Sequence, residues 1–173
     1  MTALEIAFSR THEEITTLGD LFRPHLPSIV SMTCTHRCRL IRPIISYDVS
    51  AFALSFIPAT GTEGSYTYHH LRRDVFDAVK KTGVEIESRY QVPSAHITLG
   101  RFLVQEDHAT SADRERWIRT VEEVNRWLET EVWKAEDGQF VGEWKVGQEK
   151  GLEARCGTLW YGGGRTLLAG EGY

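Results

Sequence analysis

The stretch Arg89-Tyr-Gln-Val-Pro-Ser-Ala-His96-Ile-Thr98-Leu-Gly-Arg101-Phe-Leu103 combines an apolar run with alternating polar residues. Side chains two positions apart on a β-strand point to the same face, so we expect His96 and Thr98 to lie side by side. Pro93 ends whatever precedes the strand, and Gly100 leaves room beside the backbone. The pattern therefore predicts a short strand entered through a fixed bend.

An imidazole next to a hydroxyl suits chemistry at a phosphoryl centre. The ring can move a proton near neutral pH, and the hydroxyl can donate a hydrogen bond to a non-bridging oxygen, with no need for a metal. A lone His-x-Thr is a weak signal, because a histidine on a strand is more often a packed or surface residue than a catalyst. The neighbouring residues therefore decide how the pair is interpreted.

Those neighbours carry a family resemblance. The segment Pro93-Ser-Ala-His-Ile-Thr-Leu-Gly-Arg-Phe102 resembles the second signature of the 2H phosphoesterase superfamily, whose members carry two His-x-Thr/Ser motifs, one in each pseudo-symmetric lobe. Leu40–Pro58, Tyr66–Asp74 and Gly157–Gly164 look like a fungal branch known as RNA ligase/cyclic nucleotide phosphodiesterase-like. The resemblance extends over nearly the whole chain, but only the His-x-Thr motif is specific to chemistry.

The resemblance implies one domain over residues 1–173 with a bilobal α+β fold. Mainly antiparallel sheets would line a central cleft, with helices outside and the first lobe incomplete. The order of the expected elements also favours α+β, because strands and helices are mixed without strict βαβ alternation.

The resemblance also implies a metal-independent phosphodiesterase without a cofactor, acting on cyclic nucleotides or on 2′,3′-cyclic phosphodiesters at RNA ends. His96 would be one acid/base residue, and Thr98 would hold a phosphate oxygen. Thr2 matches the hydroxyl residue of the first motif. Candidate substrate-binding residues are Tyr90, Arg101 and Tyr161. The alternatives are a non-catalytic domain that binds nucleotide, RNA or protein, and a relative that acts on a small metabolite.

The amino terminus departs from the family pattern, because the histidine expected one residue before Thr2 is absent. Either the natural chain is longer and Met1 is internal, or the protein has lost half of its acid/base pair and is weak or inactive. A polar residue at a frayed terminus is the third interpretation of Thr2. The nucleotide sequence upstream of Met1 would distinguish these cases.

Composition limits the partners. A chain of 173 residues with 41% hydrophobic residues can bury the core of one domain, and a net charge of -4 argues against a broad electrostatic grip on long nucleic acid. A small anionic ligand in a local pocket remains compatible. Three cysteines and the lack of a signal peptide or an 18-residue apolar run favour a soluble cytoplasmic protein without a membrane partner. We expect a monomer.

Periodicity and capping signals predict the remaining elements. We expect helices over His12–Phe22, Tyr66–Thr82 and from the Thr110-Ser-Ala-Asp113 cap to about Val132, and a connection marked by Pro24 and Pro27. In the second helix, the predicted buried stripe is Leu71, Val75, Phe76 and Val79. We expect strands over Thr2–Phe8, Arg39–Ser46, Val49–Ile57, Gln139–Val146, Leu152–Trp160 and Arg165–Leu168.

Cys34, His36 and Cys38 are the one potential soft-metal cluster. On a strand they would share a face, but successive residues of one strand diverge, and no second Cys/His cluster completes a four-ligand zinc site. A solvated strand edge is the simpler interpretation.

Overall fold

The chain divides into two compact units that are each assembled from distant parts of the sequence. The computed structural model describes residues 1–60, 66–88, 94–134, 142–159 and 163–173. Unit 1 comprises Met1–Thr2, Leu40–Pro58 and Ser94–Trp144, and unit 2 comprises Ala3–Arg39, Ala59–Pro93 and Lys145–Tyr173. Each unit therefore depends on long-range packing rather than on one continuous stretch of chain.

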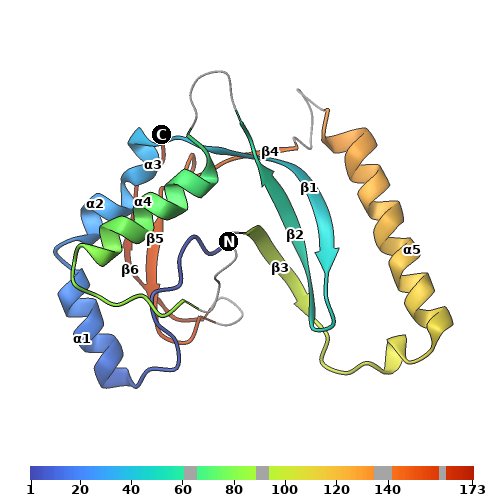
Figure 1. The fold of residues 1–173 in the computed structure, drawn as a ribbon, viewed down its shortest axis with the longest axis horizontal. Helices are drawn as coiled ribbons and strands as arrows, with labels where there is room; N and C mark the ends of the chain where they lie inside the picture. Colours follow the sequence, from blue (N-terminus) through green and yellow to red (C-terminus); the bar gives the residue numbers. More distant parts are fainter. Residues whose placement is uncertain (61–65, 89–93, 135–141, 160–162) are drawn as a thin grey trace. The chain divides into compact units, whose positions relative to one another are not determined.

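Unit 1 is built on a curled four-stranded sheet (Figure 1). Its strands are β1 (Arg39–Tyr47), β2 (Ala51–Pro58), β3 (Ala95–Arg101) and the short β4 (Glu143–Lys145), in the spatial order β3-β2-β1-β4. The β1–β2 and β2–β3 pairs are antiparallel. Strands β1 and β2 match their predicted ranges closely, and β3 is the short strand expected around His96 and Thr98.

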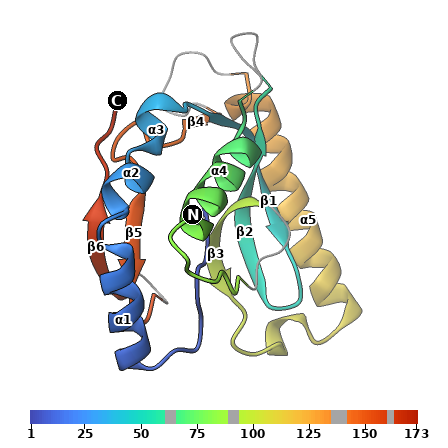
Figure 2. The ribbon, with the colours of Figure 1, turned by 60° about the vertical axis from the view of Figure 1, so that its left-hand side comes forward.

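Large side chains of β1 and β2 gather on the face of the sheet that packs against helix α5 (Ser111–Trp127). The ring of Trp117 lies 5.7 Å from that of Phe52 and 6.3 Å from that of Tyr47, measured between centroids. We call the face that carries Tyr47, Phe52 and Phe56 the aromatic face. Figure 2 shows α5 running along this side of the sheet.

Helix α5 begins and ends close to its predicted limits. Thr110 and Asp113 form the capping box, and after Trp127 the helix continues as a π-helical turn, η2 (Leu128–Val132). A short 3₁₀ helix, η1 (Glu106–His108), precedes it.

Side chains from the helical segment also satisfy the edge of β1. Asn125 accepts from the backbone amide of Ile45 at 2.6 Å and donates to its carbonyl at 3.0 Å, as a neighbouring strand would. The indole of Trp133 donates to the carbonyl of Pro43 at 2.9 Å. A sheet edge with unpaired backbone groups invites unwanted strand pairing, so these contacts protect β1 beyond β4.

Unit 2 packs four helices with a two-stranded antiparallel sheet. The helices are α1 (His12–Phe22), α2 (Leu26–Val30), α3 (Met32–Thr35) and α4 (Tyr68–Lys80), and the strands are β5 (Glu153–Cys156) and β6 (Arg165–Ala169). Packed side chains from the helices form its core: Phe22, Leu26, Ile29, Val30, Tyr68, Leu71, Val75 and Val79. Gly83, with φ +85°, follows α4 in a conformation that favours glycine.

Two local predictions are wrong, and one predicted connection contains a short helix. Residues 2–8 form no strand; the backbone bond from Glu87 N to Ile6 O, 2.8 Å long, does not extend into the ladder that a strand requires. Pro27 lies in the first turn of α2, where the missing N–H costs little, so the predicted connection is partly helical. Phe76, expected in the buried stripe of α4, is 39% exposed.

The capping residues of two helices show why their start points differ in predictability. The Thr11–Glu14 capping box could be recognised in the sequence, and α1 covers the predicted range His12–Phe22. Helix α4 begins two residues later than expected, because Thr67 caps it with His70 at the third helical position, where glutamate is usual.

The α+β fold class with antiparallel sheets is confirmed.

Candidate functional site

The His-x-Thr motif lies on β3, as predicted. His96 is half-buried and Thr98 is exposed, and the alternation of the strand places both side chains on the face opposite the aromatic face. The residues that alternate with them point the other way and pair with large side chains of β2: Ala95 lies opposite Phe56, and Ile97 lies opposite Leu54. Packing on one face therefore fixes what the other face presents.

Ser94 orients the imidazole of His96. Its Oγ lies 2.9 Å from Nδ1 of the ring, within hydrogen-bond distance. If Nδ1 carries the proton and donates to Ser94, Nε2 is a proton acceptor; if Ser94 donates, Nε2–H is a proton donor. In both tautomers the bond fixes the orientation of the ring.

The neighbouring strands add small and hydroxyl side chains to the same face. Ser55 lies directly opposite His96, and Ala53 lies opposite Thr98. On the other side of β2, Ser46 of β1 lies opposite Ala53, and its Oγ is 2.5 Å from that of Ser55. We call the face that carries Ser46, Ala53, Ser55, His96 and Thr98 the hydroxyl face.

A β-bulge brings Arg101 to this face. Thr98 pairs with Ala53 and Gly100 pairs with Phe52, so Leu99 is an extra residue on β3. Gly100 is required beneath Phe52, because a Cβ there would lie 2.5 Å from a carbon of that ring. The bulge changes the alternation, so Arg101 pairs with Ala51 and shares the face of His96, which strict alternation would forbid.

The β1–β2 turn brings the carboxylate of Asp48 near Arg101. Asp48 accepts hydrogen bonds from the amide of Ser50, the hydroxyl of Ser50 and the amide of Ala51, and these bonds lower the pKa of its carboxyl group. The exposed guanidinium of Arg101 contributes a smaller lowering of the same pKa. Arg101 is thus held near the end of the hydroxyl face that is closest to the turn.

Thr2 belongs to unit 1 together with His96 and Thr98, and it is exposed. Figure 1 marks the amino terminus near the start of β3. Two other candidates, Tyr90 and Tyr161, lie outside the described residues. Four of the six candidate residues, namely Thr2, His96, Thr98 and Arg101, are therefore in one compact unit.

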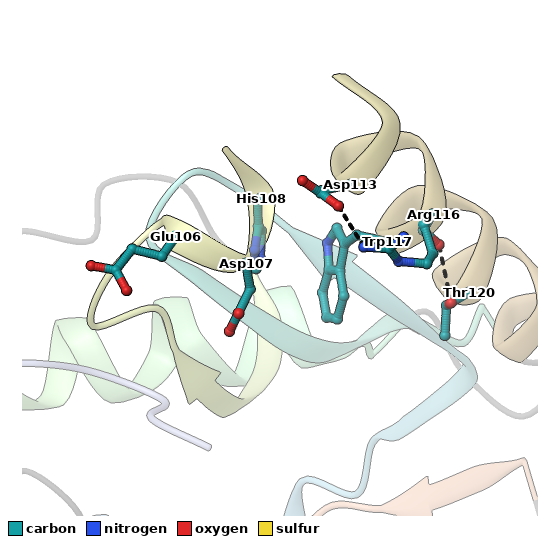
Figure 3. A pocket seen from close by; sticks show the side chains of 7 residues that line it. All are labelled: Glu106, Asp107, His108, Asp113, Arg116, Trp117 and Thr120. Carbon is teal, nitrogen blue, oxygen red and sulfur yellow. Dashed lines mark hydrogen bonds and ion pairs between the residues drawn. The ribbon is translucent and has the colours of Figure 1, made fainter. Parts of the chain in front are cut away.

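A cavity of about 570 Å³ lies elsewhere in unit 1, between η1 and the first turns of α5 (Figure 3). Its lining combines three carboxylates with one guanidinium and two rings: Glu106, Asp107, His108, Asp113, Arg116, Trp117 and Thr120. Arg116 pairs with Asp113 at 2.5 Å, so the net charge of the lining is negative and opposes a phosphate. Because Trp117 packs on the aromatic face, this cavity is on the opposite side of the sheet from His96.

The soft-metal cluster considered from the sequence is not formed on a strand. Cys34 is in helix α3, and Cys38 is buried ahead of the sheet, where desolvation raises the pKa of its thiol to about 12. In the part of the chain that the structure describes, no group of three or more His, Cys, Asp or Glu side chains is arranged to hold a metal ion. None of the described helices is long and apolar enough to span a bilayer.

Comparisons with protein-family models, curated proteins and solved structures found no match. The 2H phosphoesterase resemblance therefore rests on the quoted residues of the chain itself.

Ser46, Ala53, Ser55 and Ser94 were not predicted from the sequence as parts of a site. The structure places the small residues Ala51, Ala53 and Ser55 on one face of β2 and Phe52, Leu54 and Phe56 on the other. The period-two recurrence of these small residues was the sequence signal for a face without large side chains on β2.

Proposed function

We propose that this protein is a 2H-phosphoesterase-like, metal-independent phosphodiesterase that acts on 2′,3′-cyclic phosphodiesters of nucleotides or RNA ends. The observation that carries the proposal is the pairing of His96 and Thr98 on one strand face, with Nδ1 of His96 engaged by Ser94. The bond from Ser94 supports the proposal because it orients the ring, as a general acid or base requires.

In this proposal, Nε2 of His96 takes a proton from the attacking oxygen or returns one to the leaving oxygen. The hydroxyl of Thr98 donates to a non-bridging oxygen on which negative charge accumulates, and Thr2 adds a second hydroxyl from the amino-terminal segment. Arg101 supplies a positive charge further along the same face. The proposal includes the finer fold of the 2H superfamily, in which residues 1–173 form one bilobal domain.

Ligand binding tests the phosphate site separately from turnover. Titration of the ¹⁵N-labelled protein with a 2′,3′-cyclic nucleotide at millimolar concentration should shift the ring resonances of His96. Thr98→Val keeps the shape of the side chain but removes its hydroxyl, so the titration should then need about tenfold more ligand. Unchanged His96 resonances in the unaltered protein would contradict the proposed site.

Turnover tests the role of His96 in catalysis. His96→Ala should lower the rate of ring opening by about a hundred- to ten-thousand-fold, the usual contribution of a general acid or base. His36→Ala, which alters an exposed imidazole in unit 2, is the matched control and should leave the rate unchanged. Equal rates for the His96 variant and the control exclude the mechanism. Binding without any turnover would instead support a non-catalytic nucleotide-binding domain.

A further inference from the structure

Polar side chains flank Ala53 on three sides of the hydroxyl face. Thr98 and Ser46 are its cross-strand neighbours, and Ser55 is two positions along the same strand. His96 lies opposite Ser55 on β3, whereas the apolar Ile44 lies opposite Ser55 on β1. Side chains directly opposite one another have Cβ atoms about 5 Å apart, so an oxyanion over Ala53 is within reach of the hydroxyls on either side.

We propose that Ala53 forms the floor of the phosphate site, and that Ser55, supported by Ser46, is an additional residue that positions a phosphate oxygen. The inference rests on the proposed function and extends it, because the resemblance assigns no role to any of these three residues. The ligand is a tetrahedral phosphate or phosphodiester whose oxygens reach Thr98 on one side of the floor and Ser55 on another.

The methyl group of Ala53 makes the space available. Ala53 is half-buried, and its neighbours on the same strand that point to the other face are the bulky Phe52 and Leu54. A large side chain at position 53 would rise between Thr98 and Ser46 and occupy the volume that an oxyanion needs. Shape at this position therefore determines whether the hydroxyl groups converge on a ligand or on another side chain.

The two serines are hydrogen-bonded to each other, and a ligand would set the direction of that bond. Ser46 Oγ lies 2.5 Å from Ser55 Oγ and 3.5 Å from the carbonyl of Ala53. Either hydroxyl can donate in the shorter bond. An oxyanion beside Ser55 favours the arrangement in which Ser46 donates to Ser55, because Ser55 then directs its own O–H to the ligand and the bond that it accepts strengthens that donor.

Substitutions at position 53 test the floor by shape alone. Ala53→Leu should weaken binding of a 2′,3′-cyclic nucleotide by at least about tenfold, although it removes no polar group. Ala53→Gly keeps the floor open and should bind within about threefold of the unaltered protein. Unfolding midpoints measured for both variants show whether the sheet is retained.

Substitutions of the serines test the donors and remain informative if Ala53→Leu does not fold. Ser55→Ala should weaken binding about tenfold, Ser46→Ala should weaken it less, and Ser55→Thr should restore it, because only the hydroxyl is needed. The readout is the ligand-induced shift of the His96 ring, which a purely structural role for Ser55 would not change.

The outcomes separate this inference from the proposed function. If the unaltered protein binds the cyclic nucleotide, and Ser55→Ala or a folded Ala53→Leu variant binds it equally well, the floor and its serine donor are wrong while the His96–Thr98 site stands. If the unaltered protein shifts no His96 resonance with the cyclic nucleotide or with inorganic phosphate, both proposals are overturned. Weakened binding by Ser55→Ala with rescue by Ser55→Thr confirms the inference.

Discussion

The two faces of the sheet in unit 1 are made by the same strands but carry different kinds of side chain. On the aromatic face, Phe52 and Tyr47 pack against Trp117 of α5. On the hydroxyl face, the residues that alternate with them are Ala53 and Ser55, opposite Thr98 and His96. One set of backbone hydrogen bonds thus supports packing on one side and polar groups on the other.

Packing on the aromatic face fixes which side chains the hydroxyl face presents. A shift of β3 by one residue would move His96 to the aromatic face, where Trp117 and its neighbours pack. The register is held by the contact between Phe52 and Gly100, which lies beside the bulge at Leu99. Stability and site geometry therefore depend on different residues of the same strands, and substitutions can separate them.

The largest expected effect is on the aromatic face. Trp117→Ala removes the ring that contacts those of Tyr47, Phe52, Phe102 and His108, and should lower the free energy of unfolding by about 3 kcal/mol. Chemical denaturation measures this change. Trp127→Ala, at a position that is 46% exposed, is the matched control and should cost less than about 1 kcal/mol. Equal costs would show that the aromatic face does not hold the sheet.

A smaller loss is expected at the edge of the sheet. Asn125→Ala removes two hydrogen bonds to the backbone of Ile45 and should lower the free energy of unfolding by about 2 kcal/mol. Hydrogen exchange should show faster exchange of the Ile45 amide, while the ring contacts of Trp117 persist. If that amide stays protected in the variant, the contact from α5 is not what covers this edge.

On the hydroxyl face, we expect almost no change in stability. Thr98 is exposed, so Thr98→Val should change the free energy of unfolding by less than about 0.5 kcal/mol while weakening phosphate binding. A calorimetric scan of the variant beside the unaltered protein measures the change in the free energy of unfolding. A loss as large as that for Trp117→Ala would break the contrast between the two faces.

The smallest effect concerns the turn between β1 and β2. The pKa of Asp48 is lowered in the folded state, chiefly by hydrogen bonds from Ser50, so its contribution to stability is present above the unfolded pKa and is lost as pH falls through the folded value. Asp48→Asn should therefore reduce the fall in stability between about pH 6 and about pH 3. An identical fall in the variant would show that this carboxylate does not stabilise the turn.

Local signals explain why much of the fold could be predicted. The capping boxes at Thr11 and Thr110 mark where α1 and α5 begin, since a cap acts on residues three positions away. The expected strand over residues 2–8 shows the limit of such signals. The alternation of its side chains is that of a β-strand, but a strand also needs a partner strand. Alternation within one segment contains no information about pairing.

That His96 and Thr98 share a strand face follows from their order in the chain, because side chains two residues apart lie on the same face of any β-strand. The groups that surround them depend on how the strands pack together. The register of β2 places Ser55 and Ala53 beside the motif, and the bulge at Leu99 turns Arg101 to the same face. Both depend on contacts between strands that are distant along the chain, such as the Phe52 ring over Gly100, and no periodicity within a single strand encodes them.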